Sequence, residues 1–243
     1  MTELADLADR LRKATRVTAL TGAGVSAASG IPTFRGADGL WKKVRAETLA
    51  TPEAFERDPK LVWEWYDWRR QMITGAAPND AHHVLARWTR ERPGFTLITQ
   101  NVDGLHERAG AERLIRLHGS IWHVRCWREC AAGRADWLDP TVPQPRLPPT
   151  CPHCGAIVRP GVVWFGEPLD ASVIAAASRA AAACEIFLTI GTSSVVYPAA
   201  GLIYHAKRHG AFTAEINPDV TEASGTVDLA IRGRAEQTLL ELG

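Results

Sequence analysis

A glycine-rich turn near the start of the chain leads into a helix that is too short for the fold in which such turns usually occur. The apolar residues 17–20 run into the glycines of residues 22–24, and Ala27 stands where the G-x-G-x-x-G/A pattern has its third small residue. Residues 29–32 are Ser-Gly-Ile-Pro, and glycine followed by proline ends most helices. We therefore expect a strand, a dinucleotide-binding turn and a helix that breaks within about two turns.

Strand-like runs alternate with helical stretches along most of the chain. The expected strands are Val17–Thr21, Phe95–Thr99, residues 114–117, residues 161–165, Ile186–Ile190 and Phe212–Ile216. Helices are expected between several of them, for example over residues 79–91 and Ala171–Ala183. This alternation predicts an α/β fold in which a parallel sheet has helices on both faces, and ligands of such sheets bind at the carboxyl ends of the strands.

Four of the five cysteines lie in two close pairs. Cys126 and Cys130 are spaced C-x3-C, and Cys151 and Cys154 are spaced C-x2-C. Four thiolates suit tetrahedral zinc, and a proline-rich insert with a small core gains stability from a metal. We expect structural zinc, because four protein ligands leave no position for a substrate; a disulfide pair and free thiols are the alternatives. Cys184 stands alone and is expected to be a small buried hydrophobe.

Two segments interrupt the alternation of strands and helices. Residues 37–78 are rich in tryptophan and charge and show no clear strand, so we expect a helical module there. Residues 122–160 carry the paired cysteines and form the expected zinc module. Together the two modules are predicted to build a smaller domain beside a Rossmann-like domain that comprises residues 1–36, 79–121 and 161–243.

The charge of the chain excludes some classes of partner. The net charge is +1, so strong electrostatic attraction to nucleic acid or to an anionic membrane is not expected. No apolar run approaches the roughly 20 residues of a membrane span. The first 16 residues have the spacing of an amphipathic helix and not of a signal peptide, which favours a cytoplasmic location.

The polar motifs at the expected strand ends form a recognisable set. TGAGVSAASGIPTFRG, TQNVDGLHERAG, LHGS, the two cysteine pairs, GVVWFGE, GTSSVVYPA and EIN follow one another from about Thr21 to Asn217. As a set they resemble the sirtuins, the NAD-consuming protein lysine deacylases. The resemblance implies a Rossmann-like domain with a small domain of a zinc module and a helical module. It also implies NAD as a consumed co-substrate, structural zinc, and acylated lysine side chains of proteins as partners of a chain that we expect to be a monomer.

The resemblance accounts for the broken helix. A dehydrogenase keeps its dinucleotide whole, and an acid about 20 residues past the glycines usually holds the ribose, whereas residues 40–43 here are Leu-Trp-Lys-Lys. A sirtuin cleaves the bond between nicotinamide and ribose, so residues 33–40 are expected to form a lid over that bond. Phe34 is expected to shield the reacting ribose carbon from water, with a core position as the alternative.

The resemblance also assigns the contacts to NAD. Gly22 and Gly24 are expected to let the backbone approach the pyrophosphate. Asp103 resembles the residue that hydrogen-bonds the nicotinamide carboxamide, and Asn101 the one that orients the ribose or a water; helix capping is the alternative role of both. The full expected set is Gly22, Ala23, Gly24, Ala27, Ala28, Ile31, Phe34, Arg35, Trp41, Gln100, Asn101, Val102, Asp103, Gly191, Thr192, Ser193, Asn217 and Ala235.

His118 in LHGS is the expected general base, with Asn101 as the second catalytic residue. A neutral imidazole accepts a proton at neutral pH. The resemblance implies that the acyl-lysine oxygen attacks the ribose as nicotinamide leaves and that His118 then takes a proton from the ribose diol, which gives lysine and O-acyl-ADP-ribose. The remaining histidines are expected at the surface or at caps (His82, His83, His106, His205, His209) or in the zinc insert (His123, His153).

The stretch WEWYDWRRQ bears on the acyl group. Tyr66 and Arg69 are three residues apart and share a helix face, as in the Tyr-x-x-Arg pair with which class III sirtuins receive a negatively charged acyl chain. We therefore expect removal of succinyl and malonyl groups, with glutaryl as a further candidate, and of acetyl groups; an ordinary surface pair is the alternative. GVVWFGE is expected to offer a strand edge to the peptide. The expected substrate contacts are Tyr66, Arg69, Ala50, Val162, Val163, Trp164, Phe165 and Gly166.

Three competing functions fit parts of the pattern. A protein mono-ADP-ribosyltransferase would share the fold. A Rossmann dehydrogenase would share the glycine turn, although the broken helix and the missing acid argue against it. A catalytically silent NAD-binding module that recognises acyl-lysine would not need both His118 and Asn101.

Overall fold

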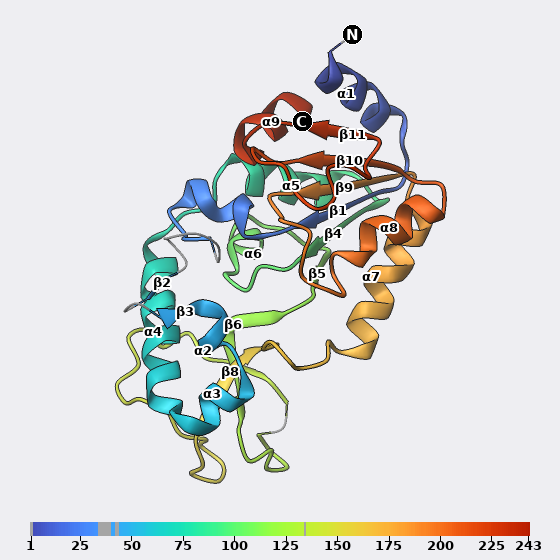
Figure 1. The fold of residues 1–243 in the computed structure, drawn as a ribbon. Helices are drawn as coiled ribbons and strands as arrows, with labels where there is room; N and C mark the ends of the chain where they lie inside the picture. The colour runs from blue at the N-terminus through green and yellow to red at the C-terminus, as the bar shows by residue number, and fades with distance from the viewer. Residues whose placement is uncertain (1, 34–39, 42–43, 134) are drawn as a thin grey trace.

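The computed structural model describes residues 2–33, 40–41, 44–133 and 135–243, and every structural statement below concerns these residues. They fold into two lobes (Figure 1). The large lobe contains a six-stranded sheet with helices on both faces. The small lobe contains a three-stranded sheet, a two-stranded hairpin and three helices. This arrangement confirms the predicted α/β fold with a smaller second unit, whereas the domain limits given above stay a prediction.

The large sheet is parallel throughout and has the order β11-β10-β9-β1-β4-β5. Every residue of β1 and β9 is buried, which is typical of parallel strands that are covered on both faces. The strands are β1 (Val17–Thr21), β4 (Phe95–Thr99), β5 (Leu114–Arg116), β9 (Ile186–Ile190), β10 (Phe212–Ile216) and β11 (Leu229–Ile231).

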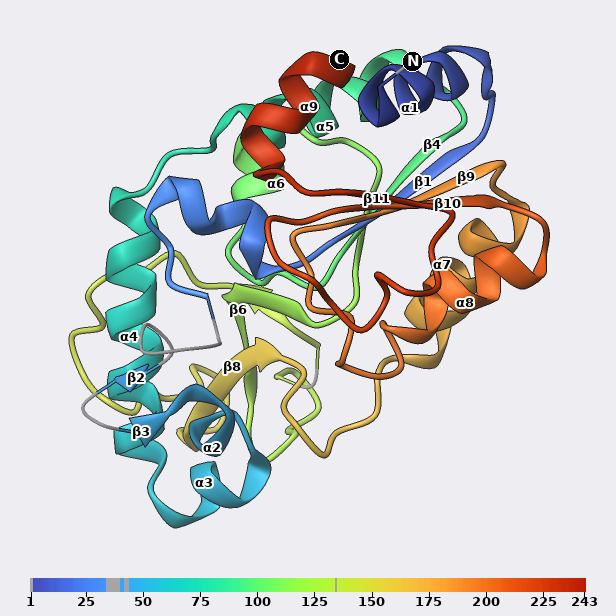
Figure 2. The same ribbon diagram turned by 45° about the horizontal axis from the view of Figure 1, so that its top comes forward.

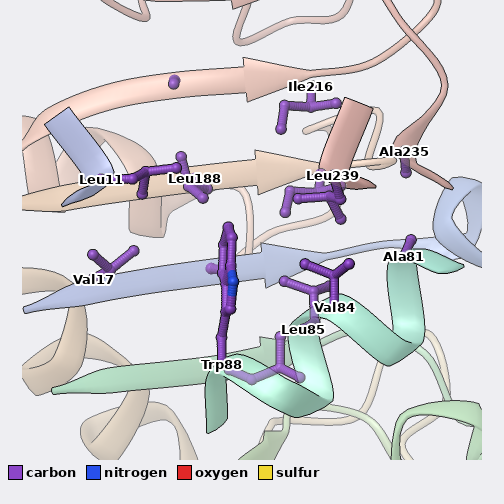
Figure 3. Packing of buried hydrophobic residues seen from close by; sticks show 14 of the residues in the cluster. Leu11, Val17, Ala81, Val84, Leu85, Trp88, Leu188, Ile216, Ala235 and Leu239 are labelled. Atoms are coloured by element: carbon purple, nitrogen blue, oxygen red, sulfur yellow. The ribbon is translucent and has the colours of Figure 1, made fainter. Parts of the chain in front are cut away.

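Two groups of helices cover the sheet. On one face α1 (Glu3–Lys13), α5 (Asp80–Glu91) and α9 (Ala235–Leu242) pack their apolar sides on the strands. Figure 3 shows the side chains of Leu85, Trp88 and Leu239 within this cluster. On the other face α7 (Ala171–Ala183) and α8 (Gly201–Arg208) pack together, as Figure 2 shows. None of the helices formed by the described residues is both long and apolar enough to cross a membrane.

The small lobe is built around an antiparallel sheet of order β7-β6-β8. Its strands are β6 (Gly119–Cys126), β7 (Trp137–Leu138) and β8 (Val158–Val162), beside a hairpin of β2 (Leu40–Trp41) and β3 (Val44–Arg45). Its helices are α2 (Ala46–Leu49), α3 (Pro52–Arg57) and α4 (Pro59–Gly75). Aromatic side chains dominate its core, with Phe55, Trp63 and Trp164 fully or almost fully buried.

Local sequence explains where α4 begins. The Asp58 carboxylate accepts a hydrogen bond from the N–H of Leu61 at 2.9 Å, and Pro59 occupies the first helical position. An acidic N-cap satisfies an otherwise unpaired N–H, and proline at the first position has none to lose. These two residues fix the start of the helix that carries Tyr66 and Arg69.

The strands differ from expectation at three places. The run at residues 161–165 was expected in the parallel sheet, but β8 ends at Val162 and pairs antiparallel with β6. The sixth parallel strand is β11, which is only three residues long and is not among the expected strands. A β2–β3 hairpin also lies within the segment expected to be helical. An apolar run predicts a strand but does not encode its partner, and a strand of three residues gives almost no periodic signal.

Candidate active site

A cavity of about 1070 Å³ lies between the carboxyl ends of the parallel strands and the small lobe. Residues 22–24, 100–102, 191–193 and 217–221, which follow β1, β4, β9 and β10, line it from the large lobe together with His118 and residues 234–236. Ala50, Tyr66, Arg69 and residues 162–167 line it from the small lobe. Its size is at the upper end for small-molecule pockets, so a dinucleotide and an acyl chain fit within one space.

Most of the expected NAD contacts line this cavity. They are Gly22, Ala23, Gly24, Ala27, Ala28, Gln100, Asn101, Val102, Gly191, Thr192, Ser193, Asn217 and Ala235. Ile31 and Asp103 are buried and do not line it. Phe34, Arg35 and the side chain of Trp41 lie outside the described residues. The contacts of all these residues with NAD stay predictions.

The glycine turn fits tightly against the loop after β9. A Cβ on Gly24 would lie 2.7 Å from the carbonyl oxygen of Gly191, and a Cβ on Gly22 would lie 2.7 Å from the Cβ of Thr192. The N–H of Gly24 donates to Gly191 O at 2.8 Å. The helix that follows, η1 (Ala23–Ser29), is a 3-10 helix that ends at Gly30 in the left-handed conformation, with a φ of 80°. The predicted early break is therefore confirmed, and both glycines are required by the contact between two loops.

The imidazole of His118 has a defined tautomer. Its Nδ1 lies 3.1 Å from the carbonyl oxygen of Gln100. A carbonyl oxygen only accepts, so Nδ1 carries the proton and Nε2 is left with a lone pair. Burial lowers the pKa of His118 below its ordinary value of 6.5, and the bond to Gln100 opposes part of that shift. A neutral half-buried imidazole that lines the cavity has the properties of a general base.

Asn101 is held beside the turn by its own amide group. Its Nδ2 donates to Gly22 O at 3.1 Å and to Ser26 Oγ at 3.3 Å. These bonds leave the carbonyl Oδ1 as the remaining polar atom of the side chain. The amide therefore reaches the cavity in a fixed orientation, ready to accept a hydrogen bond from a ribose hydroxyl or a water.

Asp103 accepts two hydrogen bonds within the protein, one of them at the start of a short helix, and its contact with NAD stays a prediction. Its Oδ1 accepts from the N–H of Leu105 at 2.9 Å, where α6 (Leu105–Arg108) starts, and its Oδ2 accepts from Ser26 Oγ at 2.8 Å. Burial raises the pKa of Asp103, and these two hydrogen bonds oppose the rise. The carboxylate thus ties the loop after β4 to the glycine turn.

Two histidines that were expected at the surface or at caps are buried. His82 does cap α5 with Asn79, but it is fully buried, and its ring centroid lies 4.8 Å from that of His106. His106 bonds Thr21 Oγ1 at 3.0 Å. Burial lowers the pKa of His82 to about 4 and that of His106 well below 6.5, so both are neutral. A signal existed for His82, which lies on the apolar face of α5.

Tyr66 and Arg69 project from α4 into the same cavity as His118. Tyr66 is 1% exposed, so the pair is not an ordinary surface pair. Burial raises the pKa of Tyr66 to about 12, which keeps it a phenol. Burial lowers the pKa of Arg69, the charge of Asp103 opposes part of this shift, and the guanidinium stays charged. The cavity is thus lined by a hydroxyl, a cation and the small side chain of Ala50.

Part of the backbone after β8, where a strand edge for a peptide is expected, is already hydrogen-bonded within the protein. The backbone N–H groups of Val163, Trp164 and Phe165 donate to acceptors within the protein at 2.8 to 3.0 Å. The acceptor for Trp164 is the carboxylate of Glu167. A peptide that adds to this segment must therefore bond to backbone groups of the segment other than these three N–H groups, or displace Glu167. Sequence alone could not reveal this, because two of the three acceptors lie far away in the chain.

The four paired cysteines form one cluster. Their Sγ atoms all lie within 4.8 Å of one another, with 3.5 Å between Cys126 and Cys154 and 3.8 Å between Cys130 and Cys151. Tetrahedral zinc with bonds of about 2.3 Å places its sulfur ligands about 3.8 Å apart, so the cluster fits this metal. No disulfide joins any of the five cysteines, all of which the structure describes. None of them lines the cavity, so bound zinc would be structural.

Comparisons with known proteins agree with this site. The Sir2 family profile matches residues 22–198 of the chain. An NAD-dependent protein deacylase of Aquifex aeolicus (strain VF5) is 52% identical over 223 residues, which cover 92% of each chain. A solved complex of a Sir2 homologue mutant with 2′-O-acetyl ADP ribose has a TM-score of 0.93 at 45% identity, and the match covers 100% of this chain and 95% of that one. A complex of Sir2 with a p53 peptide and NAD+ has a TM-score of 0.88 at 28% identity, with 100% and 97% covered. Neither a dehydrogenase nor ADP-ribosyl transfer to proteins finds support in these matches.

Proposed function

The chain belongs to the Sir2 family, and on this premise we propose that it uses NAD to remove acyl groups from protein lysine side chains, with a preference for acyl chains that end in a carboxylate. Deacylation follows from the family and from the relatives' activity. The preference among acyl groups is an inference from two side chains of this protein, Tyr66 and Arg69.

One observation carries the proposal: a single cavity holds His118 from the large lobe and the Tyr66–Arg69 pair from the small lobe. A base that activates a ribose hydroxyl must lie at the nucleotide, and groups that recognise the far end of an acyl chain must lie deeper in the acyl site. Their placement on two facing lobes suits a substrate whose acyl-lysine enters between them.

The chain's residues have the following roles in the reaction. NAD supplies the ribose that accepts the acyl group. Asn101 Oδ1 orients a ribose hydroxyl or the attacking water, and His118 Nε2 accepts the hydroxyl proton, since Nδ1 is already protonated. The loops at Gly24 and Thr192 hold the phosphates near backbone and hydroxyl groups.

The Tyr66–Arg69 pair gives the acyl preference its chemistry. A guanidinium binds a carboxylate through two parallel hydrogen bonds, and a phenol donates a third. Tyr66 is buried and Arg69 is half-buried. Charge-assisted hydrogen bonds contribute more free energy in such surroundings than at the surface. Ala50 lines the same cavity, where a larger side chain would take up part of the volume.

The test compares succinyl-lysine with a neutral chain of the same length. Peptides of one sequence that carry succinyl-, pentanoyl- or acetyl-lysine are incubated with NAD, and kcat/KM is measured by mass spectrometry of the products. Pentanoyl has the same number of heavy atoms along its chain as succinyl when one carboxylate oxygen is counted, but it carries no charge. The proposal requires succinyl to exceed pentanoyl by at least about tenfold, which corresponds to one charge-assisted hydrogen bond. Equal values would exclude recognition of the carboxylate.

A further inference from the structure

The hydroxyl of Tyr66 is engaged by a side chain of the segment after β8. Trp164 Nε1 donates a hydrogen bond to Tyr66 Oη at 2.9 Å. Both side chains are buried, with exposed fractions of 2% and 1%. An indole N–H can only donate, so the phenol oxygen must be the acceptor in this contact.

This direction leaves the Tyr66 proton to be donated elsewhere. A phenol has one O–H, and in this contact its oxygen uses a lone pair and not the proton. Burial keeps the group protonated, because its pKa is raised to about 12. Tyr66 lines the cavity, where an acyl group can supply the acceptor that a buried O–H needs. The indole thus excludes the rotamer in which the proton points back at Trp164.

Trp164 is itself held on several sides. The guanidinium carbon of Arg159 lies 3.5 Å from the centroid of a Trp164 ring, and the ring of Phe55 lies at 5.2 Å. Arg159 pairs through both terminal nitrogens with Glu167, and Glu167 accepts the backbone N–H of Trp164 at 2.8 Å. A cation over an indole face also polarises the ring, which favours donation by its N–H. Such a closed set of contacts is more than packing of an aromatic side chain requires.

We propose that Trp164 is a positioning residue that directs the Tyr66 hydroxyl proton toward the carboxylate of a bound acyl chain. The inference rests on the proposed preference for acidic acyl groups and adds a specificity-determining residue to it. Trp164 acts through Tyr66, whereas Tyr66 and Arg69 touch the acyl carboxylate. If Trp164 only fills space, any side chain of the same shape should replace it.

A double-mutant cycle tests the proposal. Wild type, Trp164→Phe, Tyr66→Phe and the double variant are compared by the ratio of kcat/KM for succinyl-lysine to that for acetyl-lysine, in which general losses of activity cancel. We expect each single variant to lower this ratio about five- to tenfold, because KM for the succinyl peptide rises. The ratio of the double variant should be no lower than that of Tyr66→Phe. An unchanged ratio in Trp164→Phe, or losses that multiply in the double variant, would overturn the proposal.

A second replacement guards against misfolding and isolates the N–H. Site-specific incorporation of 3-benzothienylalanine at position 164 keeps the bicyclic shape and removes only the donor. A positioning role predicts the low ratio of Trp164→Phe, and a packing role predicts the wild-type ratio. The failures are distinguishable: no succinyl preference in wild type rejects the proposed acyl preference together with this inference. A wild-type preference that survives loss of the N–H rejects the role of Trp164 alone.

Discussion

The Nδ1 atom of His118 lies 3.1 Å from the carbonyl oxygen of Gln100, and this contact determines which ring nitrogen can act as a base. The residue that orients the imidazole belongs to the loop after β4, which also carries Asn101. The orientation of His118 and the position of Asn101 are therefore both set by one loop. The Gln100 carbonyl orients the half-buried ring, whereas burial is what lowers the pKa of His118 and keeps it neutral.

The pH profile should report this environment. Burial lowers the pKa of His118, and a base works only when deprotonated, so kcat/KM should fall as the pH falls through that lowered pKa. With an acetyl-lysine peptide, which has no acidic acyl group of its own, the midpoint of the acid limb should lie below 6.5. The variant His118→Ala should lose acyl transfer with an unchanged circular dichroism spectrum. A midpoint above 6.5, or turnover in His118→Ala, would exclude His118 as this base.

Arg69→Met should change selectivity more than activity. The substitution keeps an unbranched apolar side chain and removes the cation, so the ratio of kcat/KM for succinyl- over acetyl-lysine should fall about 10- to 100-fold. Arg57 is exposed on α3, and Arg57→Met is the matched control that should leave the ratio unchanged. Equal losses on both substrates in Arg69→Met would contradict a carboxylate-binding role.

Gly24→Ala should destabilise the glycine turn. The added Cβ would lie 2.7 Å from Gly191 O, so one loop has to move, at a cost of about 1 to 3 kcal/mol in the free energy of unfolding. Because both loops line the cavity, KM for NAD should rise as well. Gly75→Ala, where a Cβ would have no neighbour within 4 Å, is the control. Urea unfolding that shows equal stability for both variants would refute the close contact.

Zinc should be needed for folding of the small lobe and not for chemistry at the cavity. We expect one zinc per chain by elemental analysis, and Cys151→Ser should lose the metal and unfold at a lower temperature. Cys184→Ala removes a buried cysteine of the large lobe and serves as the control, which should keep its metal. Full zinc content in Cys151→Ser would remove this residue from the ligand set.

The sequence predicted the elements whose signal is local. The apolar run of β1 ends at its glycines, and α7 spans Ala171–Ala183 as expected, because strand and helix periodicity are properties of neighbouring residues. The spacing of the C-x3-C and C-x2-C pairs also predicted that the four thiols lie together, because two close cysteine pairs are typical of a metal site.

Features that depend on distant residues were not predictable. Trp164 and Tyr66 are 98 positions apart, and no pattern in either stretch indicates their hydrogen bond. The burial of His106 depends on Thr21 and His82, which reach it from two other elements. Likewise Glu167, the last residue of the expected strand edge, accepts the N–H of Trp164 while it pairs with Arg159, and neither contact is indicated by the local sequence. Tertiary contacts decide such details after the local pattern has set the elements.

The most direct test of the account is the stoichiometry of a single reaction. A succinyl-lysine peptide is incubated with the protein and NAD, and nicotinamide, free-lysine peptide and O-succinyl-ADP-ribose are quantified together by mass spectrometry. The account predicts that the three products appear in equal amounts and that none forms without NAD. Loss of the acyl group without release of nicotinamide, or release of nicotinamide while the peptide stays acylated, would contradict it.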